Sequence, residues 1–156
     1  SGRIAFLDEN IQPRLWQYMG GICKNLNCIP VQIGGMNDHV HILCILSRDI
    51  AIKDLVGKIK SDSTNWLKSL SLAYDSFAWQ AGYGAFSVNP TECEKVVAYI
   101  VNQKQHHIKR DFCSELRMFL DKYAIEYDEN YLWNDCVYCY YGCCVLLFIW
   151  VYFGLE

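Results

Sequence analysis

The stretch between Cys28 and Leu46 constrains the fold of this chain more than any other part of the sequence. Residues 28–33 and 39–46 are rich in strand-forming apolar residues, and the five residues between them are Gly-Gly-Met-Asn-Asp. Two such runs separated by turn residues predict a β-hairpin. Alternate side chains of a strand point to the same face of a sheet, so His39 and His41 share one face. The sequence therefore predicts a strand that presents two neighbouring imidazoles.

Helical patterns alternate with the predicted strands. The expected helices cover residues 9–25, 52–70, 91–110 and 115–123. The second has its lysines on the exposed side, and the third begins at a capping box formed by Thr91 and Glu94. Residues 77–88 are aromatic and contain glycines around 82–84, which predicts a strand with a bend. Strands that alternate with helices predict a layered fold with helices on one face of a sheet.

Composition sets the broad class of protein. With 156 residues, of which 53% are hydrophobic, the chain can bury one domain core, which excludes a disordered or collagen-like chain. Nine cysteines without a recognisable leader favour a reducing compartment, so we expect a cytoplasmic protein. Residues 1–110 hold twelve Lys and Arg against nine Asp and Glu, whereas residues 111–156 hold two against eight. A basic surface for nucleic acid is therefore expected only before residue 111.

The end of the chain differs from the rest. Residues 137–155 contain no charged residue over nineteen positions, which is long enough to span a membrane. The segment is nevertheless crowded with tyrosine, cysteine, tryptophan and phenylalanine and has no basic flank. We therefore expect it to be buried in the protein or in a partner, with a membrane anchor as the alternative.

The third predicted helix carries a polar face opposite an apolar one. The residues on its polar arc are Lys95, Tyr99, Asn102, Gln103, His106 and Arg110, and those opposite are Val97, Ile100, Val101 and Ile108. Tyr99 and Gln103 are spaced i, i+4 and can reach the same point. Taken alone, Tyr99 is equally a half-buried helix residue, and the two histidines are equally surface or hydrogen-bonded residues.

Four blocks together carry a resemblance to a known family. The chain resembles the HUH-superfamily single-tyrosine transposases of small insertion sequences and their REP-associated relatives, over residues 2–133. The matching blocks are GGMNDHVHIL at 34–43, WQAGYGAFS at 79–87, YIVNQKQHH at 99–107 and YDENYLW at 127–133. Their order along the chain makes the resemblance more specific than any single block.

The resemblance implies a fold and a chemistry. It implies an α+β, ferredoxin-like (RRM-like) antiparallel sheet with helices on one face plus a C-terminal catalytic helix, in a transposase domain over 1–135. His39, His41 and Gln103 would hold Mg²⁺ or Mn²⁺, and Tyr99 would be the nucleophile. The enzyme would nick and rejoin single-stranded DNA at hairpin-flanked ends through a 5′-phosphotyrosine. The alternative is a catalytically inactive protein that still binds DNA hairpins.

The resemblance also implies partners. Members of the family work on single-stranded DNA hairpins, without a small-molecule cofactor, as homodimers in which the tyrosine helix of one subunit completes the histidine site of the other. Tyr99 would then serve the partner's metal site. The further residues expected to contact DNA are Lys95, Lys104, Arg110, Asn102 and His106 by polar contacts and Trp79 and Tyr83 by stacking on bases. For these aromatic residues, a place in the core is the alternative.

Two departures from the family pattern bear on the fold. Family members begin with a β-strand that would precede Gly2, so we expect the chain to lack this strand, which is interior in the family's sheet. The apolar tail over 136–156 is the second departure. Because residues 145–153 are strongly β-forming, we expect them to fill the vacant position, in the same subunit or in a partner. A degenerate or membrane-tethered remnant is a further alternative.

Overall fold

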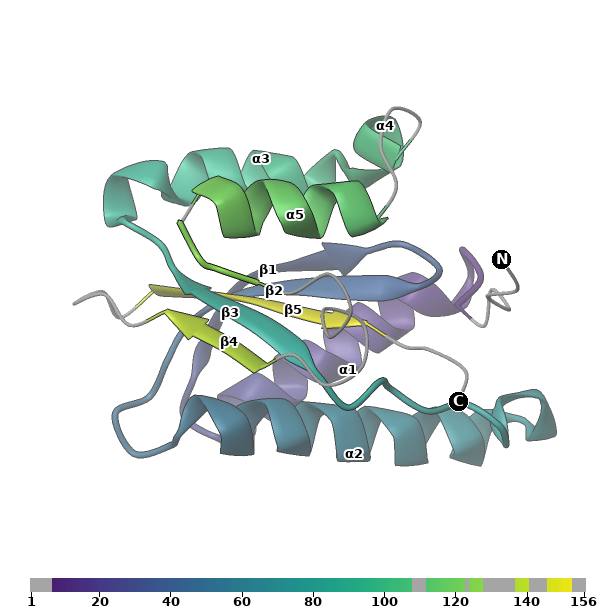
Figure 1. The fold of residues 1–156 in the computed structure, drawn as a ribbon. Helices are drawn as coiled ribbons and strands as arrows, with labels where there is room; N and C mark the ends of the chain where they lie inside the picture. Colours follow the sequence, from purple (N-terminus) through teal and green to yellow (C-terminus); the bar gives the residue numbers. More distant parts are fainter. Residues whose placement is uncertain (1–6, 108–111, 123, 128–136, 141–145, 153–156) are drawn as a thin grey trace.

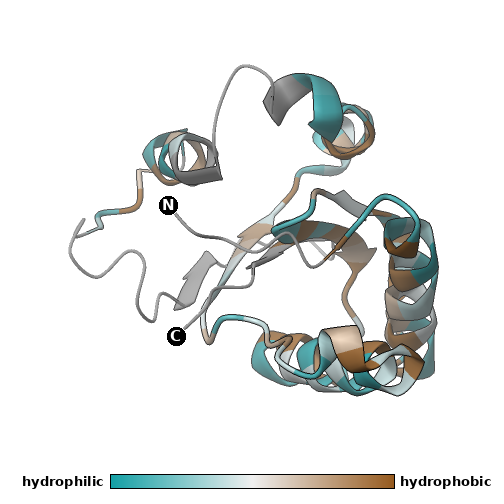
Figure 2. Ribbon diagram, turned by 90° about the vertical axis from the view of Figure 1, so that its right-hand side faces the viewer, coloured by the Kyte–Doolittle hydropathy of each residue, from teal (hydrophilic) through white to brown (hydrophobic). Residues whose placement is uncertain are grey.

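A five-stranded sheet with helices on both faces forms the protein (Figures 1 and 2). The computed structural model describes residues 7–107, 112–122, 124–127, 137–140 and 146–152. The helices are α1 (Ile11–Asn25), α2 (Ile52–Leu70), α3 (Cys93–Val101), α4 (Gln103–His107) and α5 (Phe112–Lys122), with short 3₁₀ turns η1 (Leu72–Tyr74) and η2 (Pro90–Glu92). The strands are β1 (Ile29–Gly35), β2 (His39–Ile45), β3 (Tyr83–Ser87), β4 (Val137–Tyr140) and β5 (Leu146–Tyr152). This α+β arrangement is ferredoxin-like, as the family resemblance implied.

The β1–β2 hairpin lies at one edge of the sheet. The two strands are antiparallel, with Gly34 opposite His41, and the backbone N–H of Met36 donates to the carbonyl oxygen of His39 across the turn. The hairpin predicted from the glycine-rich turn is therefore confirmed. Beyond β2, the sheet order continues as β5, β3 and β4.

The apolar end of the chain contributes an interior strand. β5 pairs antiparallel with β2 on one side, where Ile42 lies opposite Ile149, and with β3 on the other, where Ala85 also lies opposite Ile149. Within the segment expected to fill this position, Leu146–Tyr152 thus enters the sheet of its own chain beside the strand that carries the two histidines. The parallel pairing of β3 with β4 corrects the expectation of a wholly antiparallel sheet.

Each face of the sheet has its own hydrophobic cluster. On one side, α1 and α2 pack against residues such as Val40 and Ile42 of β2, and on the other, α3 and α5 cover Leu43 and Phe86 (Figure 1). Helices on a single face were expected apart from the catalytic helix. The structure also places α5 over the second face. The short amphipathic segment expected near 115–123 is an eleven-residue helix, and Leu120 of this helix is buried in the cluster on that face.

The third predicted helix is shorter than expected. It is interrupted at Asn102, whose side chain donates to the carbonyl oxygen of Ala98, and it continues as α4. The expected capping box is also wrong, since Asn89 accepts the hydrogen bond from the N–H of Thr91. The break turns Val101, expected inward, to the surface with 61% exposure. In the described part of the chain, no helix is both long and apolar enough to cross a membrane.

Candidate active site

The two histidines lie side by side under α3. His39 and His41 are fully buried, and their ring centroids are 4.7 Å apart. They follow the period of two in β2, because Val40 and Ile42 point into the cluster on the α1–α2 side. A strand buried on both faces therefore places its two imidazoles on the side that α3 covers.

Hydrogen bonds fix the orientation of the His39 ring. Its Nδ1 atom lies 2.7 Å from Oδ1 of Asp38, and its Nε2 atom lies 3.2 Å from Oε1 of Gln103. Gln103 presents its oxygen to the ring because its Nε2 donates to the carbonyl oxygen of Tyr99 at 3.3 Å. A histidine that donates one ring N–H to a carboxylate and turns the other nitrogen inward has the arrangement usual for metal ligands.

This geometry is suited to a cation. A neutral His39 that donates from Nδ1 to Asp38 carries a lone pair on Nε2, and the facing oxygen of Gln103 is also an acceptor. A metal ion held between the two atoms would make the contact favourable, because both atoms would then direct a lone pair at it. Among the described residues no group of three His, Cys, Asp or Glu side chains could hold a metal, so the donor set depends on the amide of Gln103.

Tyr99 lies next to His41 in the same chain. The centroids of the two rings are 5.5 Å apart, and the ring of Phe119 from α5 packs on Tyr99 at 5.6 Å. The hydroxyl oxygen of Tyr99 is shielded from solvent. Beside the ring, a cavity of about 650 Å³ opens between α3 and α5, and its charged lining residues are Lys95, Lys122 and Glu92.

A glycine lets α3 approach the histidines. A Cβ atom added to Gly34, the β1 residue opposite His41, would lie 2.8 Å from Cγ2 of Ile100 in α3. Carbon atoms do not approach this closely without displacement, so any side chain at this position would push α3 outward. Gly34 thus helps to set the distance between the helix that carries Tyr99 and the strand that carries the histidines.

The other polar residues predicted for the site lie around its edge. Lys95 pairs with Glu92 at 3.0 Å and Lys104 pairs with Glu9 at 2.9 Å, all at exposed or half-exposed positions. Asn102 is exposed and forms the helix break described above. Arg110 and the side chain of His106 lie outside the described residues.

The two aromatic residues expected to stack on bases are part of the core. Trp79 is 9% exposed and Tyr83 is 7% exposed, and both belong to the cluster on the α1–α2 side of the sheet. The indole N–H of Trp79 donates to Oγ of Ser63 in α2 at 2.8 Å. The expected stacking role is therefore corrected, because these rings fill the space between β3 and α2 on the face away from the histidines.

Sequence reasoning missed three residues of the site. Asp38 lies in the turn and in the matching block at 34–43, where nothing gives it a role of its own, although a carboxylate close to a ligand histidine commonly orients the ring. Gly34 lies in the same turn and block, likewise without a predicted role. Phe119 of α5 could not be found, because its contact with Tyr99 joins elements that have no regular spacing in the sequence.

Comparison with known proteins identifies the family. No curated protein and no solved structure matches the chain. The model of one protein family, described as transposase IS200 like, matches residues 2–103. This range covers more than half of the chain and includes His39, His41, Tyr99 and Gln103, whereas α5 and β5 lie beyond it. The chain therefore belongs to the family of IS200-like transposases, enzymes of DNA transposition and recombination.

Proposed function

We propose that this transposase cuts and rejoins single-stranded DNA through a covalent bond between Tyr99 and a 5′-phosphate. The observation that carries the proposal is the convergence of three buried polar side chains, His39, His41 and Gln103, with the half-buried Tyr99 ring between β2 and α3–α4. Buried polar side chains are costly unless they are satisfied, so a cluster drawn from three separate elements is typical of a functional site.

A divalent ion would be held by the Nε2 side of His39, by His41 and by Oε1 of Gln103. Mixed imidazole and amide ligation that leaves positions for water suits Mg²⁺ or Mn²⁺ better than structural zinc. When bound, such an ion stabilises the negative charge that develops on phosphate oxygens during displacement. Asp38 holds His39 in the orientation that this requires, and the carbonyl of Tyr99 holds Gln103.

Tyr99 supplies the attacking atom. Its phenolic oxygen forms a bond to phosphorus while the bond from phosphorus to the 3′-oxygen breaks. The phenol loses its proton to solvent, and the departing 3′-oxygen gains one, which leaves a 5′-phosphotyrosine and a free 3′-hydroxyl. One phosphodiester replaces another of similar energy, so the reverse attack by a 3′-hydroxyl can rejoin strands without an external energy source.

DNA would reach Tyr99 through the cavity between α3 and α5. Lys95 and Lys122 line this cavity and can neutralise phosphates next to the one that reacts. Because Phe119 covers the tyrosine ring and the hydroxyl is shielded, α5 has to move aside before phosphorus can come within bonding distance. We expect α5 to be displaced when DNA binds.

The central experiment is incubation with labelled single-stranded hairpin DNA and Mn²⁺. We expect a covalent protein–DNA adduct that survives denaturing electrophoresis and is lost in Tyr99→Phe. Tyr74→Phe removes the same hydroxyl from a half-buried tyrosine after α2 and should leave the adduct unchanged. Tight DNA binding by the wild type without any adduct would instead favour the inactive hairpin-binding protein.

Metal binding can be tested without activity. A ligand present at a hundred times its Kd adds about 2.7 kcal/mol to the free energy of unfolding. We therefore expect Mn²⁺ to raise the Tm of the wild type and not that of His41→Ala or Gln103→Leu. Gln105→Leu changes an exposed glutamine of the same helix and should keep the shift. An equal Mn²⁺ shift in all variants would exclude this site.

Subunit mixing tests which chain supplies the tyrosine. Tyr99 and His41 of one chain are neighbours, which supports a site built within a single subunit. A mixture of Tyr99→Phe and His41→Ala subunits should then form no adduct. Recovery of adduct in the mixture would instead support the shared arrangement that the family resemblance implies.

A further inference from the structure

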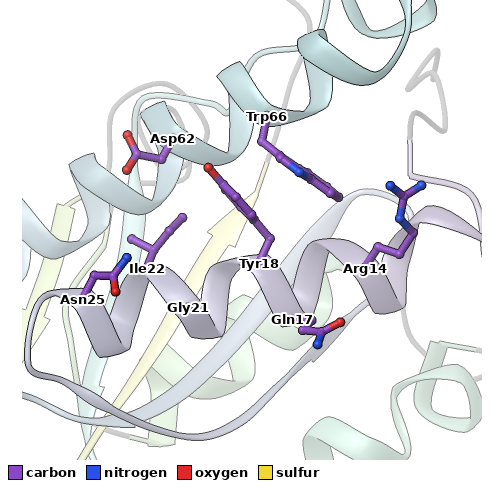
Figure 3. A pocket seen from close by; sticks show the side chains of 8 residues that line it. All are labelled: Arg14, Gln17, Tyr18, Gly21, Ile22, Asn25, Asp62 and Trp66. Atoms are coloured by element: carbon purple, nitrogen blue, oxygen red, sulfur yellow. The ribbon is translucent and has the colours of Figure 1, made fainter.

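A second polar cavity lies on the opposite side of the sheet from the histidines. It has a volume of about 440 Å³ and opens between α1 and α2. The residues that matter here are Arg14, Tyr18, Gly21 and Asn25 of α1 and Asp62 and Trp66 of α2 (Figure 3). None of them belongs to the site proposed for cleavage.

Two stacked rings form one wall of this cavity. Tyr18 and Trp66 have centroids 4.8 Å apart and an interplanar angle of 13°, and the guanidinium of Arg14 lies 5.6 Å from the Trp66 ring centroid. Figure 3 shows Trp66 and Arg14 on one side of Tyr18 and Gly21, Asn25 and Asp62 on the other. The face of Tyr18 turned away from Trp66 borders the part of the cavity lined by Gly21, Ile22 and Asn25, and a ring that extends the stack would lie there.

The space beyond Tyr18 is open above Gly21. A Cβ atom added to this glycine would meet nothing within 4 Å, apart from its chain neighbours and its own helix backbone. A flat ring can therefore lie against Tyr18 over the backbone of α1. The carboxylate of Asp62, which pairs with Lys58 at 3.1 Å, and the amide of Asn25 lie at the edge of this space.

We propose that this cavity binds an unpaired base of the DNA strand, and that it prefers a base with an exocyclic amino group. The inference rests on the proposed function, which supplies single-stranded DNA as the ligand. Stacking on an aromatic ring accepts any base, whereas a carboxylate accepts hydrogen bonds from amino groups such as N4 of cytosine. Thymine has no amino group to offer.

The charges around the cavity fit a nucleotide better than an uncharged aromatic ligand. Arg14 lies at one end beside Trp66, and Lys58 lies at the other end beside Asp62. Both are exposed, so each can contact a phosphate of the strand that continues on either side of the bound base.

The first test fills the cavity. Gly21→Leu places a side chain where the base would lie, and it should also strengthen the helix, since glycine is unfavourable in helices. We expect the affinity for oligodeoxycytidine at physiological salt to fall roughly fivefold to a hundredfold, as expected for one stacked base. Gly57→Leu makes the same change at an exposed, equally open glycine of α2 and should leave the affinity unchanged.

The second test separates base reading from simple charge. Asp62→Leu removes the acceptor, so oligodeoxycytidine should bind more weakly while oligothymidine does not. If the cavity only attracts or repels phosphates, removal of a negative charge should strengthen the binding of both oligonucleotides. Equal affinity of the wild type and Gly21→Leu for oligodeoxycytidine would overturn the proposal.

Failure of this inference can be told apart from failure of the proposed function. The adduct on Tyr99, measured at saturating hairpin DNA, should form normally in Gly21→Leu because the cavity lies on the other face of the sheet. An adduct together with unchanged affinity would reject only the base cavity. A loss of affinity in Gly21→Leu without any adduct in the wild type would reject only the cleavage chemistry.

Discussion

The two faces of the sheet differ in how their buried polar side chains find hydrogen-bond partners. On the α1–α2 side, twenty buried hydrophobic residues form one cluster among the described residues, whereas five do so on the α3–α5 side. Buried polar groups on the first side bond over shorter distances along the chain: Gln12 donates to the carbonyl of Leu7, and Ser63 donates to that of Ile59 and accepts from the indole of Trp79, 16 residues away. On the second side, His39 and Gln103 meet from segments that are 64 residues apart.

This difference indicates that the α1–α2 side mainly stabilises the fold and that the α3–α5 side mainly carries the candidate site. The larger apolar cluster provides most of the burial that holds the sheet and helices together, since stability scales with the apolar area removed from water. The smaller cluster leaves room for a group of polar side chains whose positions depend on how α3 and α4 dock. Changes on the first side should therefore alter stability, and changes on the second side should mainly alter the site.

The largest expected effect on stability lies in the α1–α2 cluster. Leu15 is fully buried in α1, and Leu15→Ala should lower the free energy of unfolding by about 2–5 kcal/mol through lost burial and a cavity. Chemical denaturation measures this change. Leu72→Ala, at a position that is 84% exposed, is the matched control and should change stability little. A loss below 1 kcal/mol at Leu15 would contradict the assignment of this side as the main core.

Gly34 tests the junction between the two sides. Gly34→Ala brings a methyl group against Ile100 and should cost about 1–3 kcal/mol through overpacking. Because α3 is pushed away from the sheet, we also expect a smaller Tm shift with Mn²⁺ and a lower yield of the Tyr99 adduct. Both losses should remain under conditions in which the variant is still folded. Gly20→Ala, where the added methyl meets only ordinary contacts, should leave the metal shift intact. Normal metal binding in Gly34→Ala would show that the distance set by this glycine does not matter.

Lys60 tests the polar contacts at the edge of the large cluster. Its ammonium donates to the carbonyl oxygens of Gln80, Ala81 and Gly82 at 2.6–2.9 Å and so fixes the loop before β3. Lys60→Met should lower stability by about 1 kcal/mol, a typical net value for such contacts. Lys58→Met, at an exposed lysine two residues earlier, is the control. Equal stability of the two variants would show that the loop is held by apolar contacts alone.

The same lysine gives a dependence on pH. Burial lowers the pKa of Lys60 from 10.5 to about 8. Between these values the unfolded chain binds more protons than the folded chain, so this group makes the protein more stable as the pH rises from 8 toward 10. The stability difference between the wild type and Lys60→Met should grow over this range, as measured by denaturation at each pH. A constant difference would show that the pKa of Lys60 is not lowered.

The smallest expected effect is at the exposed pair between the two sides. Glu9 and Lys104 lie 2.9 Å apart with side chains that are 78% and 63% exposed, and Glu9→Ala should change stability by less than about 1 kcal/mol. The same change releases Lys104 and should slightly strengthen DNA binding at low salt. Fluorescence anisotropy with labelled single-stranded DNA measures this effect, and weaker binding would place the pair outside the DNA-binding surface.

Much of the fold could be read from local patterns. The hairpin follows from the turn at 34–38, and α2 begins and ends where its periodicity predicts, at Ile52 and Leu70. The pairing of His39 and His41 on one face follows from the period of a strand alone. These features are set by neighbours within a few residues, so the sequence specifies them directly.

Other features depended on contacts between distant segments. Trp79 and Tyr83 are aromatic residues of the kind that stack on bases, but they are packed in the core against α2. Lys60 was expected on the exposed side of its helix, but its ammonium contacts the loop at 80–82. The break at Asn102 was not predicted, because the helical periodicity runs through it unchanged. Next to the break, Gln103 is buried against His39 while Val101 is exposed to solvent.

The sequence by itself determined the hairpin, the main helices, the pair of imidazoles and the family. Only the tertiary structure decided that β3 pairs in parallel with β4, that Asp38 orients His39, and that α5 covers Tyr99. The reason is physical: local geometry repeats along the chain and leaves a pattern in the sequence, whereas the docking of separate elements depends on shape and burial across the whole fold.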